Sequence, residues 1–304
     1  NTIGGAAAAA RNVISANGDT ASIGSGVFIT GTAATGNTVR GNYIGVDTSG
    51  AAAQGNYING VHVERAGNTT IAGNVISGNG GRGIVVAYTQ AAGTVIQGNT
   101  IGLDATGTND LGNAGYGVWL FNTTNITLGG TTASARNIIS GNNNDNVAIT
   151  NGSTNITIQG NYIGLNAAGT AGIDTTYSYN GLYLDGAASG ITIGGTAAGA
   201  RNVIASNHDG IQLDGADSCT ILGNYIGTDA SGSARVDNVH GIRIIDGAGN
   251  TIGGTAAGAR NVLSGNGQGL VIYGSAAANN QVQGNTIGLN AAGTAAMGNS
   301  GSGI

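Results

Sequence analysis

Side chains suited to acid–base chemistry gather in residues 185–243. Asp185 and Asp214 stand at equivalent positions, each four residues after the glycine that opens an apolar segment, Gly181 or Gly210. Carboxylates stacked on successive turns of a repeat raise one pKa of the pair, so they can act as an acid/base pair or hold a cation. The other catalytic candidates lie near the preceding turns and strand, and are Asp209, His208, His240 and Arg243.

A second group of polar side chains runs from Asp104 to Asp110, in the loop DATGTND. Calcium takes six or more oxygen ligands, and the recurring D-x-x-G pattern supplies only one carboxylate. We therefore favour Asx-turns here and keep Asp104 and Asp110 as the calcium candidate to check first. No other cofactor is predicted, because the single cysteine, Cys219, offers no metal cluster and fits a small buried core residue.

The composition excludes several classes of protein. The 304 residues include 60 glycines, no proline and no lysine; 8% are charged and 40% are hydrophobic. So much Ile and Val can offset the entropy of ordering the chain, which favours a repeat protein over a disordered linker. A net charge of −5 with scattered arginines argues against a nucleic-acid partner, and no apolar run is long enough for membrane insertion.

The most regular signal is an asparagine just before apolar residues, as in RNVIS, GNYIG and GNTIG. Its intervals of 22 to 41 residues alternate between long and short, which makes a double-coil unit of roughly 60 residues. Asparagine tolerates the left-handed backbone of a sharp bend, and stacked asparagines can hydrogen-bond to one another. We predict a ladder made of Asn12, Asn42, Asn74, Asn99, Asn137, Asn161, Asn202, Asn224, Asn261 and Asn285.

Each repeat also contains a glycine followed by two apolar residues separated by one position. Period two with β-branched residues indicates a strand, and two more short strands follow in each repeat. Such strands bury a face only when like strands stack in parallel. The prediction is an all-β, right-handed parallel β-helix of about ten three-strand coils, a single domain over residues 1–304. The inward pairs are Val27/Ile29, Val61/Val63, Ile84/Val86, Val118/Leu120, Val147/Ile149, Leu182/Leu184, Ile211/Leu213, Ile242/Ile244 and Leu270/Ile272.

The outward positions between these pairs form one mixed row along the predicted rod. Trp119 and Tyr183 in this row could stack on sugar rings, which makes them the carbohydrate-binding candidates. The row reads Phe28, His62, Val85, Trp119, Ala148, Tyr183, Gln212, Arg243 and Val271.

Two repeated strings identify the repeat subtype, NTIGGTAAGARNVLSGN and QGNTIGLNAAGTAAMGN. They resemble repeats of bacterial extracellular right-handed parallel β-helix proteins of the pectate-lyase-like superfamily, over essentially the whole chain. The resemblance implies extracellular or cell-surface placement, with surface attachment or carbohydrate contact. The insertion IGGTAAGARN recurs in alternate coils, and the coil beginning at Gly60 lacks it. We expect its arginines to clamp carbonyls or a turn carboxylate such as Asp229; they are Arg11, Arg136, Arg201 and Arg260.

Three functions fit these observations. The first is a structural or interaction solenoid, such as an adhesin stalk, spacer or filament subunit. The chain starts in mid-coil without a capping helix, so we expect an excerpt of a longer repeat array, whose partners are further coils or rods stacked end to end. The alternatives are a polysaccharide hydrolase or lyase using Asp185 and Asp214, and a non-catalytic glycan-binding module using Trp119 and Tyr183. The short flanking turns favour the structural function.

Overall fold

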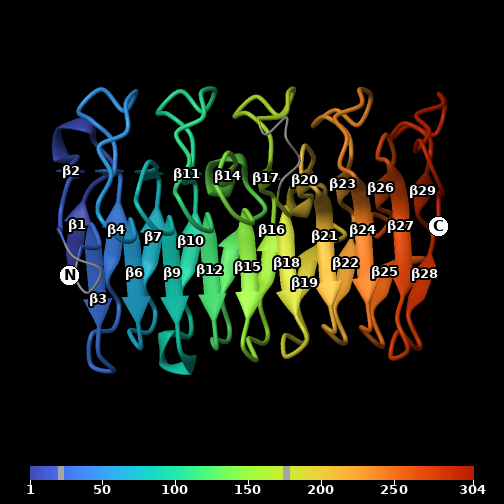
Figure 1. The fold of residues 1–304 in the computed structure, drawn as a ribbon, viewed down its shortest axis with the longest axis horizontal. Coiled ribbons are helices and arrows are strands. Elements are labelled where there is room, and N and C mark those ends of the chain that lie inside the picture. The colour runs from blue at the N-terminus through green and yellow to red at the C-terminus, as the bar shows by residue number, and fades with distance from the viewer. Residues whose placement is uncertain (20–23, 174–178) are drawn as a thin grey trace.

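The computed structural model describes residues 1–19, 24–173 and 179–304, and it is a straight rod of stacked coils (Figure 1). In this part of the chain, two parallel sheets of ten strands and one of nine run along the rod. Neighbouring strands in each sheet come from successive coils, as a solenoid requires. The fold is therefore the predicted right-handed parallel β-helix. Among the described residues, no helix has the length and apolar character needed to cross a bilayer.

The strands are short and recur in the same order in each coil. The nine-stranded sheet contains β3 (Val27–Thr30), β6 (Val61–Glu64), β9 (Ile84–Ala87), β12 (Val118–Phe121), β15 (Val147–Thr150), β18 (Leu182–Asp185), β21 (Asp209–Asp214), β24 (His240–Ile245) and β27 (Gln268–Tyr273). The first ten-stranded sheet contains β1 (Thr2–Gly4), β4 (Thr38–Arg40), β7 (Thr70–Ala72), β10 (Val95–Gln97), β13 (Thr127–Gly129), β16 (Thr157–Gln159), β19 (Thr192–Gly194), β22 (Thr220–Leu222), β25 (Thr251–Gly253) and β28 (Gln281–Gln283).

The second ten-stranded sheet has two residues per strand. It contains β2 (Val13–Ile14), β5 (Tyr43–Ile44), β8 (Val75–Ile76), β11 (Thr100–Ile101), β14 (Ile138–Ile139), β17 (Tyr162–Ile163), β20 (Val203–Ile204), β23 (Tyr225–Ile226), β26 (Val262–Leu263) and β29 (Thr286–Ile287). Short 3₁₀ helices lie in the connecting loops, and they are η1 (Ala8–Ala10), η2 (Thr89–Ala91), η3 (Ala133–Ala135) and η4 (Ala198–Ala200).

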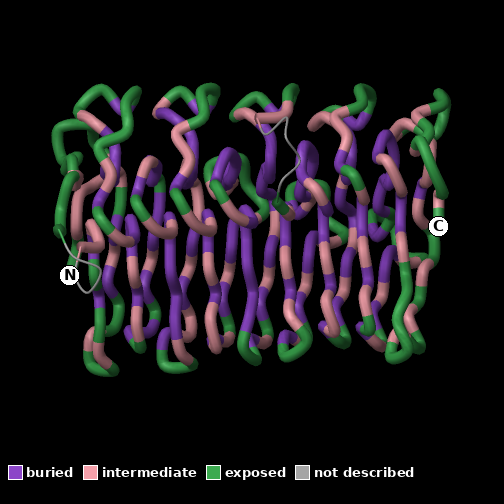
Figure 2. The backbone as a smooth tube through the Cα atoms, in the orientation of Figure 1, coloured by how far each residue is buried: buried purple, intermediate pink, exposed green. Residues whose placement is uncertain are grey.

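Aliphatic side chains from all three sheets fill the interior of the rod. Figure 2 shows that buried residues recur along the strands, while most exposed residues lie in the loops. Like residues lie over one another: Val118 pairs with Ile84 on one side and Val147 on the other, and all three are fully buried. The predicted inward pairs are buried in the same way, with one correction. Ile272 is 36% exposed because its strand, β27, ends the sheet and has a neighbour on one side only.

The predicted asparagine ladder is present, with side-chain links of 2.9 to 3.1 Å between all ten residues. Nδ2 of Asn161 donates to Oδ1 of Asn202 and to the carbonyl of Leu128, both at 3.0 Å. Oδ1 of Asn161 accepts from the backbone N–H and from Nδ2 of Asn137. A fully buried amide thus has its donors and acceptor satisfied, which removes the cost of burying it.

The predicted backbone reason for this ladder is wrong. All ten asparagines lie in the described chain, and none has a left-handed backbone. In six of the ten positions that conformation falls on the preceding glycine, as at Gly73 (φ 65°) and Gly160 (φ 71°), and in the other four an arginine of the insertion precedes the asparagine. Glycine adopts it without a steric penalty. At those six positions the bend therefore depends on glycine, and in all ten coils the asparagine contributes its amide.

A second asparagine ladder, which the sequence analysis missed, lies inside the bend that leads into the nine-stranded sheet. Asn146 completes it by joining Asn142 to Asn207 through two 3.0 Å links. Its spacing in the sequence is irregular, because loops of different length precede each rung: Asn79 follows Asn74 by 5 residues, but Asn56 follows Asn42 by 14. Its members are Asn17, Asn56, Asn79, Asn113, Asn142, Asn146, Asn207, Asn238, Asn266 and Asn299.

Loops from alternate coils contact one another outside the rod and form the projections along one edge in Figure 1. These loops have the sequence D-x-x-G or N-x-x-G, and they are joined by backbone hydrogen bonds of 2.8 or 2.9 Å between coils that are two apart. This contact gives the double-coil repeat of the sequence a physical basis. The bonds run from Ala105 N to Gly50 O, Ala167 N to Gly107 O, Ala230 N to Gly169 O and Ala291 N to Gly232 O.

The recurring arginines bind the neighbouring coil. Nε of Arg136 donates to the carbonyl of Gly160 at 3.1 Å, and its guanidinium carbon lies 4.1 Å from the centre of the Tyr162 ring. The expected carbonyl bonds are thus present, while Asp229 accepts from its own turn. Tyrosine stacking was not predicted. The other carbonyl bonds run from Arg11 to Gly41, Arg201 to Gly223 and Arg260 to Ala291.

Candidate functional site

The outer face of the nine-stranded sheet carries three parallel rows of side chains. The central row is the one predicted from Phe28 to Val271, and its members pair in register along the sheet. The leading row lies on one side of it and consists of the residue two positions before the first member of each inward pair. Its members are Ser25, Asn59, Arg82, Tyr116, Asp145, Asn180, Asp209, His240 and Gln268. The trailing row is Thr30, Glu64, Ala87, Phe121, Thr150, Asp185, Asp214, Ile245 and Tyr273.

Asp209 is the centre of a polar cluster on the leading row. Its side chain is fully buried, and its Oδ1 lies 2.6 Å from Nδ1 of His240 and 3.0 Å from Nδ1 of His208. Nη1 of Arg243 donates to its Oδ2 at 3.3 Å. A buried carboxylate needs such partners to remain charged. The structure therefore brings four of the predicted catalytic residues together, and Tyr273 joins them by a hydrogen bond with Nη2 of Arg243.

A second buried carboxylate, Asp145, was missed by the sequence analysis. It is 8% exposed, and its Oδ1 accepts from the backbone N–H of Asn180 at 2.9 Å. Burial raises the pKa of Asp145 to about 6, and the charge of Asp209 adds to this rise. Asn180 connects the two carboxylates, because its Oδ1 accepts from the N–H of Asp209 at 3.2 Å. Asp145 occupies the same position in its coil as Asp209 does, and this equivalence could have identified it from the sequence.

Replacing Asp145 with asparagine should stabilise the protein at neutral pH. Between the ordinary pKa of 3.8 and the folded value of about 6, the folded state holds a proton that the unfolded state has released, so stability falls as pH rises through this window. Asp145→Asn removes that loss and should raise the free energy of unfolding by up to about 3 kcal/mol at pH 7. Urea denaturation at pH 3.5 and pH 7 measures it. Equal stability of the two proteins at pH 7 would contradict the prediction.

Asp185 and Asp214 occupy paired positions, but at the opposite end of the strands from Asp209. The two carboxylates have different hydrogen-bond partners. Oδ2 of Asp185 accepts from the N–H of Asn151 at 2.8 Å, and Oδ2 of Asp214 accepts from the Tyr183 hydroxyl at 3.4 Å. The predicted patch is thus two separate groups, because Asp209 and Asp214 stand at the two ends of the six-residue strand β21. The two groups lie at opposite edges of the same outer face.

An aromatic groove occupies the N-terminal half of the face. Two adjoining hollows of about 520 and 210 Å³ share the side chains of Asn59, His62, Glu64 and Arg82. The first also contains Phe28, whose ring lies 4.9 Å from that of His62 between centres. The second continues over the following coils, where it is lined by Tyr88, Trp119 and Phe121.

The structure separates the two predicted carbohydrate-binding residues. Trp119 lines the groove, with the Arg82 guanidinium carbon 4.2 Å from its ring centre and its Nε1 donating to the Thr150 hydroxyl. Tyr183 lies two coils further along the central row, outside the groove. Burial, followed by the nearby charge of Asp214, raises the pKa of Tyr183 to about 12. Tyr183 therefore stays a neutral hydroxyl between the groove and the Asp209 cluster.

The predicted calcium candidates serve as turn residues in the structure. Oδ1 of Asp104 accepts from the backbone N–H groups of Thr108 and Asn109, and the Thr106 hydroxyl and the Asn109 side chain also donate to its carboxylate. These hydrogen bonds lower the pKa of Asp104 to about 2 against the opposing effect of burial. Asp110 accepts from the N–H of Gly112 at 2.9 Å. This is the Asx-turn arrangement favoured from the sequence.

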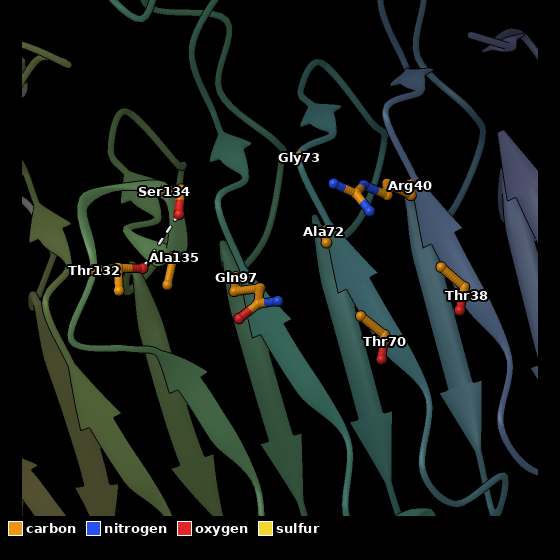
Figure 3. Close-up of a pocket in the computed structure, with 9 residues that line it drawn as sticks. All are labelled: Thr38, Arg40, Thr70, Ala72, Gly73, Gln97, Thr132, Ser134 and Ala135. Carbon is orange, nitrogen blue, oxygen red and sulfur yellow. Dashed lines mark hydrogen bonds between the residues drawn. The ribbon is translucent and has the colours of Figure 1, made fainter. Parts of the chain in front are cut away.

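A polar hollow of about 450 Å³ lies over β4, β7 and β10, in the coil that lacks the insertion (Figure 3). Where insertions stand two coils apart, they touch: a Cβ on Gly199 would lie 1.9 Å from the carbonyl oxygen of Thr131. The residue equivalent to Gly199 beside the hollow is Ser134, and its hydroxyl lies 3.2 Å from that of Thr132. A side chain fits there because no neighbouring insertion fills the space. The hollow is thus the gap left by one missing loop.

No protein-family model matches the chain, and no curated protein matches it. Similar solved structures include the periplasmic alginate epimerase AlgG, with 18% identity over 82% of this chain and 49% of that one, at a TM-score of 0.49. The A-module of the Azotobacter vinelandii mannuronan C-5 epimerase AlgE6 has 19% identity over 83% and 58%, also at 0.49. The Dettilon tailspike protein has 14% identity over 81% and 47%, at 0.44. This chain spans about half the length of these proteins, and the likeness concerns the fold alone.

Proposed function

We propose that the protein is a rigid solenoid of an extracellular or cell-surface protein, and that the outer face of its nine-stranded sheet binds a polysaccharide. The proposal keeps the structural role expected from the sequence and adds a ligand to it. Two asparagine ladders and continuous sheets make the rod stiff, so the face presents its side chains at fixed intervals.

The observation that carries this proposal is the elongated aromatic groove. Phe28 is 56% exposed on a rod whose other large apolar side chains are mostly buried, and it stacks with His62 at one end of the groove. Trp119 and Phe121, 4.8 Å apart between ring centres, line the other end. Aromatic faces beside polar groups are the usual surface for sugar rings, whose C–H faces are apolar and whose hydroxyls are polar. Arg82 and Glu64 line the same groove, where their side chains can donate and accept hydrogen bonds.

Shortening the groove aromatics should weaken glycan binding. Phe28→Ala and Trp119→Ala each remove one stacking surface, worth about 1 kcal/mol, so each should lower affinity by about five- to tenfold. A glycan array identifies the ligand, and calorimetry on the best binder measures the change for each variant.

The matched control is Tyr225→Ala, which removes an aromatic ring from the second ten-stranded sheet, where it lies beside Arg201. Its affinity should equal that of the wild type. Binding that survives Phe28→Ala and Trp119→Ala, or that falls equally in Tyr225→Ala, would exclude the groove as the site. An array that shows no bound glycan for the wild type would leave the structural role alone.

Catalysis on the bound glycan is the second candidate function. The specific observation is the convergence of His240 and Arg243 on buried Asp209, on the same face as the groove. A histidine oriented by a buried carboxylate can act as a general base, and an arginine can neutralise an acidic sugar. Glycan recovered after incubation distinguishes the functions: altered chains with the wild type but intact chains with His240→Ala indicate an enzyme, and intact chains with both indicate binding alone.

A further inference from the structure

Three metal-ligand side chains converge where β21 and β24 begin. Nδ1 of His240 and Nδ1 of His208 lie 2.6 and 3.0 Å from the same oxygen, Oδ1 of Asp209. Within residues 1–19, 24–173 and 179–304, this is the one group of at least three His, Cys, Asp or Glu residues whose ligand atoms lie within 4.8 Å of one another. We propose that His208, Asp209 and His240 bind a divalent transition-metal ion of the zinc type.

The spacing of the three atoms suits a tetrahedral ion. Zinc binds histidine nitrogen and carboxylate oxygen at about 2.0 to 2.1 Å, which places neighbouring ligands about 3.3 Å apart. The observed separations from Oδ1, 2.6 Å for His240 and 3.0 Å for His208, are shorter than this by about 0.7 and 0.3 Å, and side-chain rotations can lengthen them. An ion at the centre takes the place of the protons that now bridge the imidazoles and the carboxylate.

The neighbouring strand and Arg243 fix the side chain of Asp209 in an orientation that suits metal binding. Its side chain is fully buried, and β21 and β24 pair Asp209 directly with His240. Arg243 donates to Oδ2, which leaves Oδ1 for the ion, and Arg243 is itself fixed by its hydrogen bond with Tyr273. Partners that orient a ligating carboxylate in this way strengthen metal binding.

The types of ligand atom determine which ions the site would prefer, and the exposure of the two histidines lets an ion reach it. Two imidazole nitrogens with one carboxylate oxygen favour zinc, cobalt or nickel over calcium and magnesium, which prefer oxygen ligands. The side chains of His208 and His240 are 40% and 20% exposed, so the fourth coordination position faces solvent on the outer face. The inference does not require glycan binding, since it concerns the ion alone.

Titration of the full chain with metal tests the site. After treatment with a chelator and dialysis, calorimetry with zinc chloride should show one ion per chain, and cobalt(II) should give the visible absorption of a four-coordinate complex. His208→Ala and His240→Ala should each weaken zinc binding by about tenfold or more and abolish the cobalt spectrum, since each removes one of three ligands.

The third histidine of the chain, His62, provides the matched control, because it lies in the aromatic groove and away from Asp209. His62→Ala should bind zinc like the wild type. Circular dichroism checks that each variant is folded, and His240→Gln replaces His240→Ala if the latter unfolds. Absence of zinc binding in the wild type, or equal binding in the His208 and His240 variants, overturns the proposal. The Phe28 and Trp119 variants address the glycan separately, so either proposal can fail alone.

Discussion

Replacing Asn161 with alanine is expected to lower the free energy of unfolding by about 3 kcal/mol or more. The substitution removes the four side-chain hydrogen bonds of a fully buried amide. The backbone N–H of Asn137 loses its acceptor, and the Leu128 carbonyl, Nδ2 of Asn137 and Oδ1 of Asn202 each lose one hydrogen bond. Each buried polar group left unsatisfied costs about 1 to 3 kcal/mol. Urea denaturation followed by circular dichroism measures the change.

The end rung of the same ladder is the control. Asn12 is exposed, and its side chain makes one ladder bond, to Oδ1 of Asn42. Asn12→Ala should therefore cost no more than about 1 kcal/mol, because water replaces the lost partner. If both variants lose the same small amount, the ladder does not contribute to stability through its buried amides. A repeat protein can also unfold in parts, so two optical probes should be compared for coincident transitions.

The parts of this structure that follow from stacking could be predicted from the sequence. A residue at a given point of one coil lies beside its equivalent in the next, so the spacing of Asn137, Asn161 and Asn202 was enough to predict a ladder of side chains. The pairing of Trp119 with Ala148 and of Asp185 with Asp214 followed in the same way. Comparing equivalent coils also showed that the coil beginning at Gly60 lacks the inserted loop.

The parts that depend on loop length and side-chain rotation could not be predicted. Asn146 joins the second ladder across two coils, which no fixed interval indicates. Arg243 belongs to the central row but reaches back to Asp209 on the leading row, while Asp214 on the trailing row turns to Tyr183. The sequence therefore placed the candidate residues on the correct face, and the conformations of long side chains decided which of them meet.

The aromatic groove is another feature that could not be predicted from the sequence. The shortness of the flanking turns predicted low walls, and the hollows that contain Phe28 and Trp119 are indeed bounded by side chains of the face itself, such as Glu64 and Arg82. Such a groove depends on which large and small residues alternate along three rows. Val85 and Ala87, which line the hollow beside Trp119, leave space because they are small. The residues of the central row alone therefore do not predict the groove.

Replacing Gly129 with alanine is expected to be among the most damaging glycine substitutions in the described part of the rod. The glycine has a φ of 89°, and a Cβ there would lie 1.9 Å from the carbonyl oxygen of Gln159 and 2.5 Å from Oδ1 of Asn161. Both atoms belong to the next coil, and the second is a ladder rung. The alanine must therefore push two coils apart or displace the ladder, in addition to adopting a left-handed backbone.

Gly152→Ala separates the two effects. Gly152 also has a left-handed backbone, with a φ of 77°, but a Cβ there would meet no atom within 4 Å. Its alanine variant should lose only about 1 kcal/mol, from backbone strain. Gly129→Ala should lose at least about 2 kcal/mol more, because a clash between coils adds to the same strain. Thermal and urea denaturation of both variants provide the comparison.

The comparison also tests why a glycine recurs after Ile or Leu, directly before the external loops. Gly102, Gly164 and Gly194 repeat the geometry of Gly129: each has a positive φ, and a Cβ on each would lie 1.9 to 2.1 Å from a carbonyl oxygen of the next coil. The chain leaves the rod at these points to form a loop, and only a residue without a side chain lets the next coil approach so closely. Equal losses in Gly129→Ala and Gly152→Ala would show that backbone conformation alone selects these glycines. A larger loss at Gly129 would show that close stacking of the coils selects them.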